Sequence, residues 1–247
     1  LIVEAKTGSF TDVGQLKSTA PSQSVANETA DQVAPNIFNA TLDYGLGTLV
    51  VSSTETLLLS SQAFVNFTAI VVRNHSADPG IRLTGASVDE FNSLQATINL
   101  LETQRIPLMY LSGEPGGDGV AVIVDFEHGA FQDIGLNPSN TARDIVCTEF
   151  PDEFPPNILS ATINYTDGKV RIFADEYIDS TPTSLVNLSL IHIADVSEDK
   201  TVPLLGAGIV SKDDVYLTLL LTEAQRAAAI YVSGGPGGNG GAAVLDV

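Results

Sequence analysis

The chain repeats itself at a fixed offset of 121 residues, without a gap. Residues 35–44 match 156–165, and 101–117 match 222–238. Close to a third of the aligned positions between 35–126 and 156–247 are identical, and many others exchange Ile, Leu and Val. Self-similarity at a fixed period indicates an array of folded units, each with the same fold.

The chain opens partway through a repeat. Residues 1–4 align with 122–125, and residues 8–14 align with 129–135. We therefore expect the start of the chain to be the detached last segment of a repeat. We also expect the second unit to lack its own copy of that segment.

The length of 247 residues fits two domains of ordinary size. Short strands separated by turns predict an all-β protein of two tandem Ig-like β-sandwich domains, each with one short helix. The predicted parts are a detached terminal strand (1–16), a polar linker (17–34), domain 1 (35–140), a Pro-containing linker (141–155) and domain 2 without its last strand (156–247).

Local patterns support strands with one helix per unit. Residues 158–165 alternate apolar with small or polar side chains, 166–168 supply a turn, and 170–174 resume the alternation, which predicts a β-hairpin. Thr222 and Gln225 form a capping-box pattern at a helix start. In the first copy, Pro107 predicts a helix of only about one turn.

Charge and cysteine content exclude several functions. The net charge is −19, so polyanions such as nucleic acid would be repelled. No apolar run is long enough to cross a bilayer, so we expect no membrane insertion. Cys147 is the single cysteine, which excludes an internal disulfide. We expect a buried, inert thiol there, with a covalent link to another chain as the alternative.

Six sequons indicate a secreted, extracellular glycoprotein at a cell surface, because the N-x-[ST] pattern is the acceptor for N-linked glycans. Asn66 and Asn187 occupy the same repeat position, so that sequon belongs to the unit itself. The predicted glycosylation sites are Asn27, Asn39, Asn66, Asn74, Asn164 and Asn187.

No pattern of catalytic residues or strong metal ligands is present in the sequence. His75, His128 and His192 are scattered and form no pair with zinc-ligand spacing. The glycine-rich run 234–241 leads into another strand pattern rather than a helix, which argues against a phosphate-binding loop. We therefore expect no enzyme, no cofactor and no catalytic metal. Weak calcium binding at most is expected, either near the acidic residues Asp175, Glu176 and Asp179 or in the inter-domain region.

One set of positions resembles the opening of bacterial-type Ig-like tandem domains, which are found in surface-layer proteins and adhesins. A closing segment of those domains is similar to residues 129–138. The resemblance implies an Ig-like sandwich in an extracellular array and implies no ligand. The positions that carry it are Pro156, Asn157, Ile158, Ala161, Tyr165, Gly168 and Val170.

Taken together, these patterns predict a structural subunit of an extracellular glycosylated fibre or surface layer. The alternative is a cell-surface adhesion or glycan-binding module. We expect copies of the chain to form a head-to-tail homopolymer by strand donation, with Ile2, Val3, Phe10 and Val13 as donor side chains. A competing interpretation is that these residues are part of a longer tandem chain, in which segment 1–16 belongs to the preceding unit.

Overall fold

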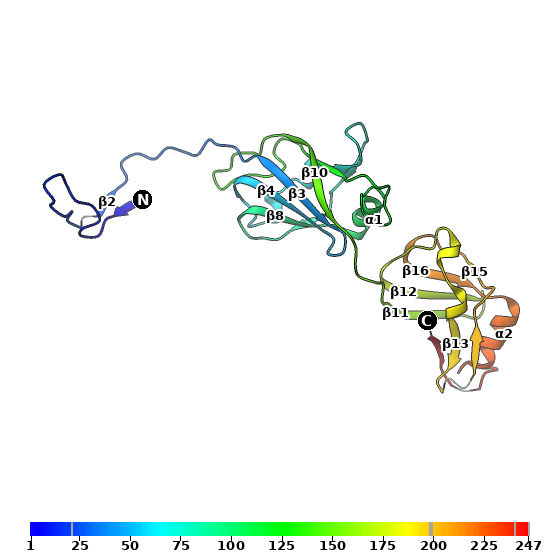
Figure 1. Ribbon diagram of the computed structural model, residues 1–247. Coiled ribbons are helices and arrows are strands. Elements are labelled where there is room, and N and C mark those ends of the chain that lie inside the picture. The colour runs from blue at the N-terminus through cyan, green and yellow to red at the C-terminus, as the bar shows by residue number, and fades with distance from the viewer. Residues whose placement is uncertain (21, 198–199, 240, 247) are drawn as a thin grey trace. The chain divides into compact units, whose positions relative to one another are not determined.

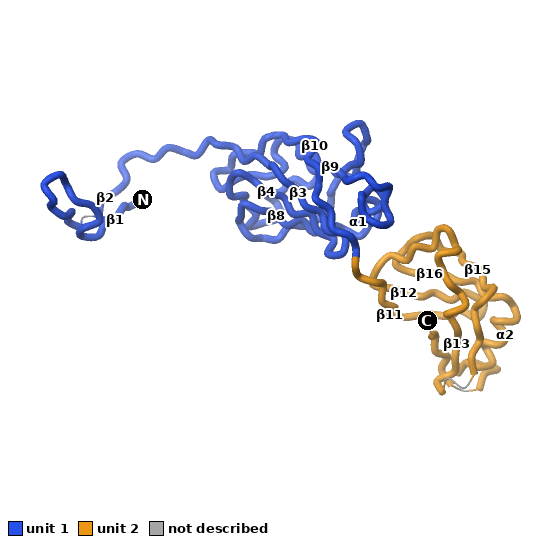
Figure 2. Tube along the Cα trace, viewed as in Figure 1, with its two compact units in different colours: residues 1–152 blue, residues 153–247 orange. Residues whose placement is uncertain are grey.

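The computed structural model describes residues 1–20, 22–197, 200–239 and 241–246 (Figure 1). The chain forms two compact units, 1–152 and 153–247 (Figure 2). Strands make up most of the regular structure in both units, so the prediction of an all-β protein is confirmed.

The described residues of unit 1 form ten strands, two short 3₁₀ turns and one α-helix. Its elements are β1 (Ile2–Glu4), β2 (Ser22–Ser24), β3 (Ile37–Asp43), β4 (Thr48–Leu57), η1 (Gln62–Phe64), η2 (Phe67–Ala69), β5 (Ile70–Arg73), β6 (Ile81–Arg82), β7 (Ser87–Val88), β8 (Ser93–Asn99), α1 (Glu102–Tyr110), β9 (Ile123–Phe126) and β10 (Ala142–Phe150).

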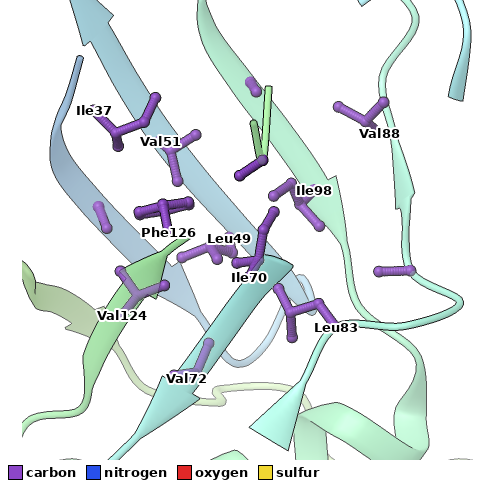
Figure 3. Packing of buried hydrophobic residues seen from close by; sticks show 14 of the residues in the cluster. Ile37, Leu49, Val51, Ile70, Val72, Leu83, Val88, Ile98, Val124 and Phe126 are labelled. Carbon is purple, nitrogen blue, oxygen red and sulfur yellow. The ribbon is translucent and has the colours of Figure 1, made fainter. Parts of the chain in front are cut away.

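Eight of these strands are hydrogen-bonded in the order β6-β5-β9-β10-β3-β4-β8-β7. β10 runs parallel to β3 and antiparallel to β9, so it connects the two halves of the sheet. The side chains between the halves form an aliphatic core, in which Phe126 lies among Val, Ile and Leu (Figure 3). Alternation produces this core: Leu49 and Val51 of β4 are fully buried, whereas Val50 between them is partly exposed.

Where unit 2 is described, it has seven strands, two 3₁₀ turns and one α-helix. Its elements are β11 (Ile158–Asn164), β12 (Lys169–Ile178), η3 (Thr183–Leu185), η4 (Leu188–Leu190), β13 (His192–Asp195), β14 (Thr201–Pro203), β15 (Gly208–Ile209), β16 (Asp214–Leu220), α2 (Glu223–Tyr231) and β17 (Ala243–Asp246).

The elements of unit 2 follow those of unit 1 at the repeat offset. β11, β12, β16 and α2 begin 121 residues after β3, β4, β8 and α1. The strands form two separate sheets, β11-β12-β16-β15 and β14-β13-β17. These correspond to the two halves of the unit 1 sheet, and the strand that corresponds to β10 is not present among the described residues of unit 2.

Both helices have the same length, contrary to the prediction from Pro107. α2 has the predicted capping box, in which Gln225 N donates to Thr222 Oγ1 at 3.3 Å and Thr222 N donates to Gln225 Oε1 at 3.0 Å. α1 is nine residues long in total, and Pro107 lies inside it. Its buried Gln104, Arg105 and Leu108 hold it against the sheet, so packing outweighs the hydrogen bond that proline cannot donate.

The boundary predicted between the domains also changes. Most of the expected linker 141–155 is β10, the strand that connects the two halves of the unit 1 sheet. Unit 1 therefore extends to residue 152, and the connection to unit 2 is correspondingly short.

Candidate assembly groove

An open groove runs between β11 and β17 in unit 2. The space between its walls, including the open solvent at its mouth, is about 300 Å³. We call it the assembly groove and define it by its lining residues, which are Ala161, Thr162, Ile163, Val170, Ile193, Ala243, Val244 and Leu245. β11 and β17 correspond to β3 and β9, so the groove lies where β10 lies in unit 1.

Unit 1 shows how a strand fills this position. Cys147 of β10 faces Ala40 of β3 across a parallel pairing that continues to Phe150 and Asp43. On its other edge, β10 pairs with β9 at Ile145↔Val124. The main chain of one strand thus satisfies the backbone groups of two neighbours.

The unfilled position exposes apolar side chains in unit 2. Ile158 is 44% exposed, whereas its counterpart Ile37 is 5% exposed. Ala161 is exposed, whereas Ala40 is fully buried. A strand edge with exposed apolar neighbours favours pairing with another chain, because its backbone groups and side chains both gain a partner.

A buried polar contact fixes β10 in unit 1. The Tyr44 hydroxyl donates to Glu149 Oε1 at 2.5 Å, and Gly113 N donates to Glu149 Oε2 at 2.9 Å. Burial of the phenol, followed by the hydrogen bond to Glu149, raises the pKa of Tyr44. Tyr165 and Gly234 are the counterparts in unit 2, and no hydrogen bond joins the Tyr165 hydroxyl or Gly234 N to another described residue.

A buried arginine forms a second contact at the end of β10. The Arg105 guanidinium donates to Tyr44 O at 2.9 Å, to Asp152 Oδ2 at 2.6 Å and to Glu102. Its counterpart Arg226 donates to Tyr165 O at 2.9 Å and to Glu223. Within the described residues, Arg226 therefore repeats two of the three contacts and has no carboxylate at the position of Asp152.

The start of the chain has the fold of the segment that closes unit 1. β1 pairs with β2 antiparallel, as β9 pairs with β10, but the register differs by one residue. Ile2 pairs with Ser24, whereas its counterpart Ile123 pairs with Val146, the counterpart of Val25. The loop hydrogen bonds repeat at an offset of 121: Gly8 N to Ser18 O at 2.9 Å, and Gly129 N to Ser139 O at 2.9 Å. The bridges Thr11↔Lys17 and Gln132↔Pro138 repeat in the same way.

Two predicted donor side chains have counterparts with different environments. Phe10 is 66% exposed, and its counterpart Phe131 is fully buried in the unit 1 core. Val13 is fully exposed, but its counterpart Ile134 is also 53% exposed. Phe10 therefore remains a donor candidate, and unit 1 gives no support for Val13.

The other two predicted donor residues, Ile2 and Val3, lie on β1 and are exposed. They correspond to Ile123 and Val124 of β9. β17 already holds the β9 position in unit 2. Neither residue is therefore placed in the groove by this comparison.

The predicted donor segment also requires correction. Residues 127–139, the counterparts of 6–18, form a loop with turns and isolated bridges rather than a strand. The strand that fills the position is β10, and its counterpart is 22–29 within the expected linker 17–34. The sequence signal that could have shown this is Val25 and Glu28, which align with Val146 and Glu149.

The structure separates the six sequons into two groups. Five asparagines are exposed, namely Asn27, Asn39, Asn66, Asn164 and Asn187. Asn66 and Asn187 each precede a 3₁₀ turn, and each Oδ1 accepts from the sequon hydroxyl at 2.6 Å. Asn74 is half-buried and its Nδ2 donates to Asp118, so the nitrogen that would carry a glycan already has a partner.

The acidic groups fall into a different arrangement from the predicted one. Asp175 accepts from Asn157 N at 2.7 Å, a hydrogen bond that lowers the pKa of Asp175, and Asp179 accepts from Thr181 N at 3.0 Å. Among the described residues, the three carboxylates whose oxygens lie within 4.8 Å of one another are instead Asp31, Glu55 and Asp133. Desolvation, followed by repulsion from Asp31 and Asp133, raises the pKa of Glu55.

Comparisons with known proteins add little beyond this geometry. No family model matches the chain. No curated protein matches its sequence. Among solved structures, the chain is similar to the N-terminal part of the bacterial S-layer protein SbsC, with a TM-score of 0.33 and 12% identity over 77% of this chain. The match spans 45% of the SbsC chain. In the part of the chain that is described, no helix has the length and hydropathy of a membrane span.

Proposed function

We propose that this protein is a structural subunit of an extracellular, N-glycosylated fibre or surface layer, whose copies join head to tail by strand donation. One observation carries the proposal. The same chain contains an open groove in unit 2 and a segment, 1–31, folded like the segment that closes unit 1. A surface and its complement on one molecule allow a heterologous contact, which repeats into an open filament unless it closes into a ring.

The surface of the protein supports an extracellular location. Five exposed sequon asparagines are distributed over both units and the N-terminal segment. Glycans at these positions would cover strand surfaces and limit sideways association. The net charge of −19 would also limit sideways association, because the like-charged sides of two copies repel each other. The proposal assigns the protein no enzymatic activity, no cofactor and no metal.

Negative-stain imaging of the glycosylated protein tests this function. We expect filaments or ordered arrays that lengthen as the protein concentration rises, because each added copy presents a new groove. A variant lacking residues 1–31 should remain monomeric, and mass analysis before and after glycosidase treatment should show glycans at Asn66 and Asn187. Monodisperse particles at every concentration, or unmodified Asn66 and Asn187, would contradict the proposal.

A further inference from the structure

We infer that residues 6–31 of one copy fill the assembly groove of a second copy, in the register that residues 127–152 hold in unit 1. Glu28 then accepts hydrogen bonds from Tyr165 and Gly234 N, and Asp31 pairs with Arg226. This inference rests on the proposed function and names the residues that set the contact.

The docked segment begins after residue 5 because unit 2 already has a strand at the preceding position. β17 corresponds to β9 and pairs with β13 from His192↔Asp246 to Asp195↔Ala243. Residues 1–5 correspond to the same position, so they have no vacant site in unit 2. Docking therefore replaces the pairing of β2 with β1 by a pairing with β17. Residues 22–29 correspond to β10, and they would run parallel to β11 and antiparallel to β17, as β10 does between β3 and β9.

Apolar contacts from the segment are few. Phe10 corresponds to the buried Phe131, and Ala26 corresponds to the buried Cys147. Residues 22–24 are Ser, Gln and Ser, so they add little apolar area. Backbone pairing therefore supplies much of the attraction, and weakly apolar strands are prone to slip in register. Specific polar contacts are needed to select one register.

Glu28 supplies the first of these contacts. It aligns with Glu149, whose carboxylate binds the Tyr44 hydroxyl and Gly113 N in unit 1. The two donor groups are retained in unit 2 as the Tyr165 hydroxyl and Gly234 N. Glu28 of the docked segment would therefore meet a phenol and a backbone N–H, as Glu149 does in unit 1. A shift of the segment by one residue would turn the Glu28 side chain to the opposite face.

Asp31 supplies the second contact. It aligns with Asp152, which binds Arg105 at 2.6 Å. Arg226 keeps the contacts of Arg105 to the carbonyl oxygen and to the helix glutamate, Glu223. In the undocked chain Asp31 lies close to the carboxylates of Glu55 and Asp133. Docking would move the Asp31 carboxylate away from these two like charges and place it beside the Arg226 guanidinium.

The connections on the two sides have the same length. Four residues separate Asp152 from Asn157, at the start of the second repeat, and four separate Asp31 from Asn36. The docked segment can therefore lead into the next unit 1 as the end of unit 1 leads into unit 2. The acceptor is a second copy, and the contact can be repeated along an array.

A register-specific disulfide tests the pairing in the full chain. Cys147 faces Ala40 in unit 1, so Ala26 of one copy should face Ala161 of another. Adjacent strands lie about 4.8 Å apart, which is within the range for a disulfide between Cα positions. Chains carrying A26C and chains carrying A161C, both with C147A, are mixed and oxidised. We expect a covalent dimer.

The matched control is V25C in place of A26C. Its counterpart Val146 is exposed and points to the opposite face, so it should form little dimer with A161C. Equal cross-linking of V25C and A26C, or no cross-linking of either, would overturn the inferred register. Each single-cysteine chain oxidised alone reports any pairing between identical sites.

Polar variants test the two contacts in the same assay. E28Q, Y165F and D31N should each reduce the yield of in-register dimer by about tenfold at limiting concentration, as expected for a lost charge-assisted hydrogen bond. Combining E28Q with Y165F should reduce the dimer yield by less than the two single effects added together, because both substitutions remove the same contact. E4Q lies outside residues 6–31 and should leave the yield unchanged. Additive effects, or a loss with E4Q as large as with E28Q, would contradict the assignment.

The outcomes separate this inference from the proposed function. Filaments without the A26C–A161C disulfide would overturn the register and leave the structural role in place. An in-register dimer without filaments would support the inference and overturn the filament. Circular dichroism of each variant verifies that it folds, so a loss of cross-linking is not an effect of unfolding.

Discussion

Cys147 and Ala26 occupy the same repeat position in different environments. Cys147 is buried on β10, and Ala26 is exposed near the start of the chain. Burial, followed by the nearby Glu149 carboxylate, raises the pKa of the Cys147 thiol from 9.0 to about 12. Because the folded-state pKa is raised, the associated stabilisation is complete below pH 9 and is lost as the pH rises from 9 through about 12.

We predict that Cys147 in the native chain reacts with a thiol reagent at pH 8 only as fast as unit 1 opens. The thiolate is the reactive form, and both burial and the raised pKa keep it scarce. Rates of iodoacetamide labelling, followed by mass spectrometry, should rise by orders of magnitude in denaturant. The control is A26C with C147A, which should label rapidly in undocked protein. Equal native rates at the two positions would contradict the prediction.

Among the elements, the hairpins could be predicted from the sequence and β10 could not. Apolar alternation and a turn indicated β11 and β12, which pair as expected. β10 has the sequence Ala-Arg-Asp-Ile-Val-Cys-Thr-Glu-Phe, in which apolar and polar residues do not alternate strictly. Its strand conformation comes from pairing with β9 and with β3, and β3 lies far away in sequence. Local periodicity carries little information about such pairing.

The same limit explains the errors at the candidate site. The 121-residue match pointed to segment 1–16 through Phe10 and its glycines, because those residues are distinctive. Residues 22–29, the counterparts of β10, form a strand only over Ser22–Ser24, and their small and polar side chains are typical of a linker. The proposed roles of Glu28 and Asp31 rest on the contacts of their counterparts, Glu149 with Tyr44 and Asp152 with Arg105, and the sequence does not show these contacts.

Strands β3 and β11 should differ in amide hydrogen exchange. β3 pairs on both edges, with β4 and β10, whereas β11 pairs with β12 alone among the described residues. We expect peptides covering 158–164 to exchange at least about tenfold faster than peptides covering 37–43 in undocked protein, because one row of backbone groups faces solvent. Assembly should slow the exchange of 158–164 and leave 37–43 unchanged. Similar protection of both strands in monomeric protein would show that the groove edge is already covered.

At the scale of the whole molecule, the two units should differ in stability. The cluster of buried residues in unit 1 has 24 members, and the cluster in unit 2 has 12 among the described residues. Part of the difference arises at the groove, where Ile158 and Ala161 are exposed. Because folding stability is a small balance of large terms, a smaller core lowers the melting temperature of unit 2.

We therefore predict two calorimetric transitions at low protein concentration, with unit 2 unfolding first. A matched pair of variants assigns them: Leu219→Ala should lower only the first transition, and Ile98→Ala, at the same repeat position, only the second. Both side chains are fully buried, so each change should cost about 2–5 kcal/mol. As the concentration rises, docking of residues 6–31 should raise the first transition toward the second, because a ligand that binds only the folded state stabilises it by mass action. A first transition that stays fixed over a hundredfold range of concentration in the native chain would show that the groove binds no second copy, whereas the same result in a chain lacking residues 1–31 is the expected control.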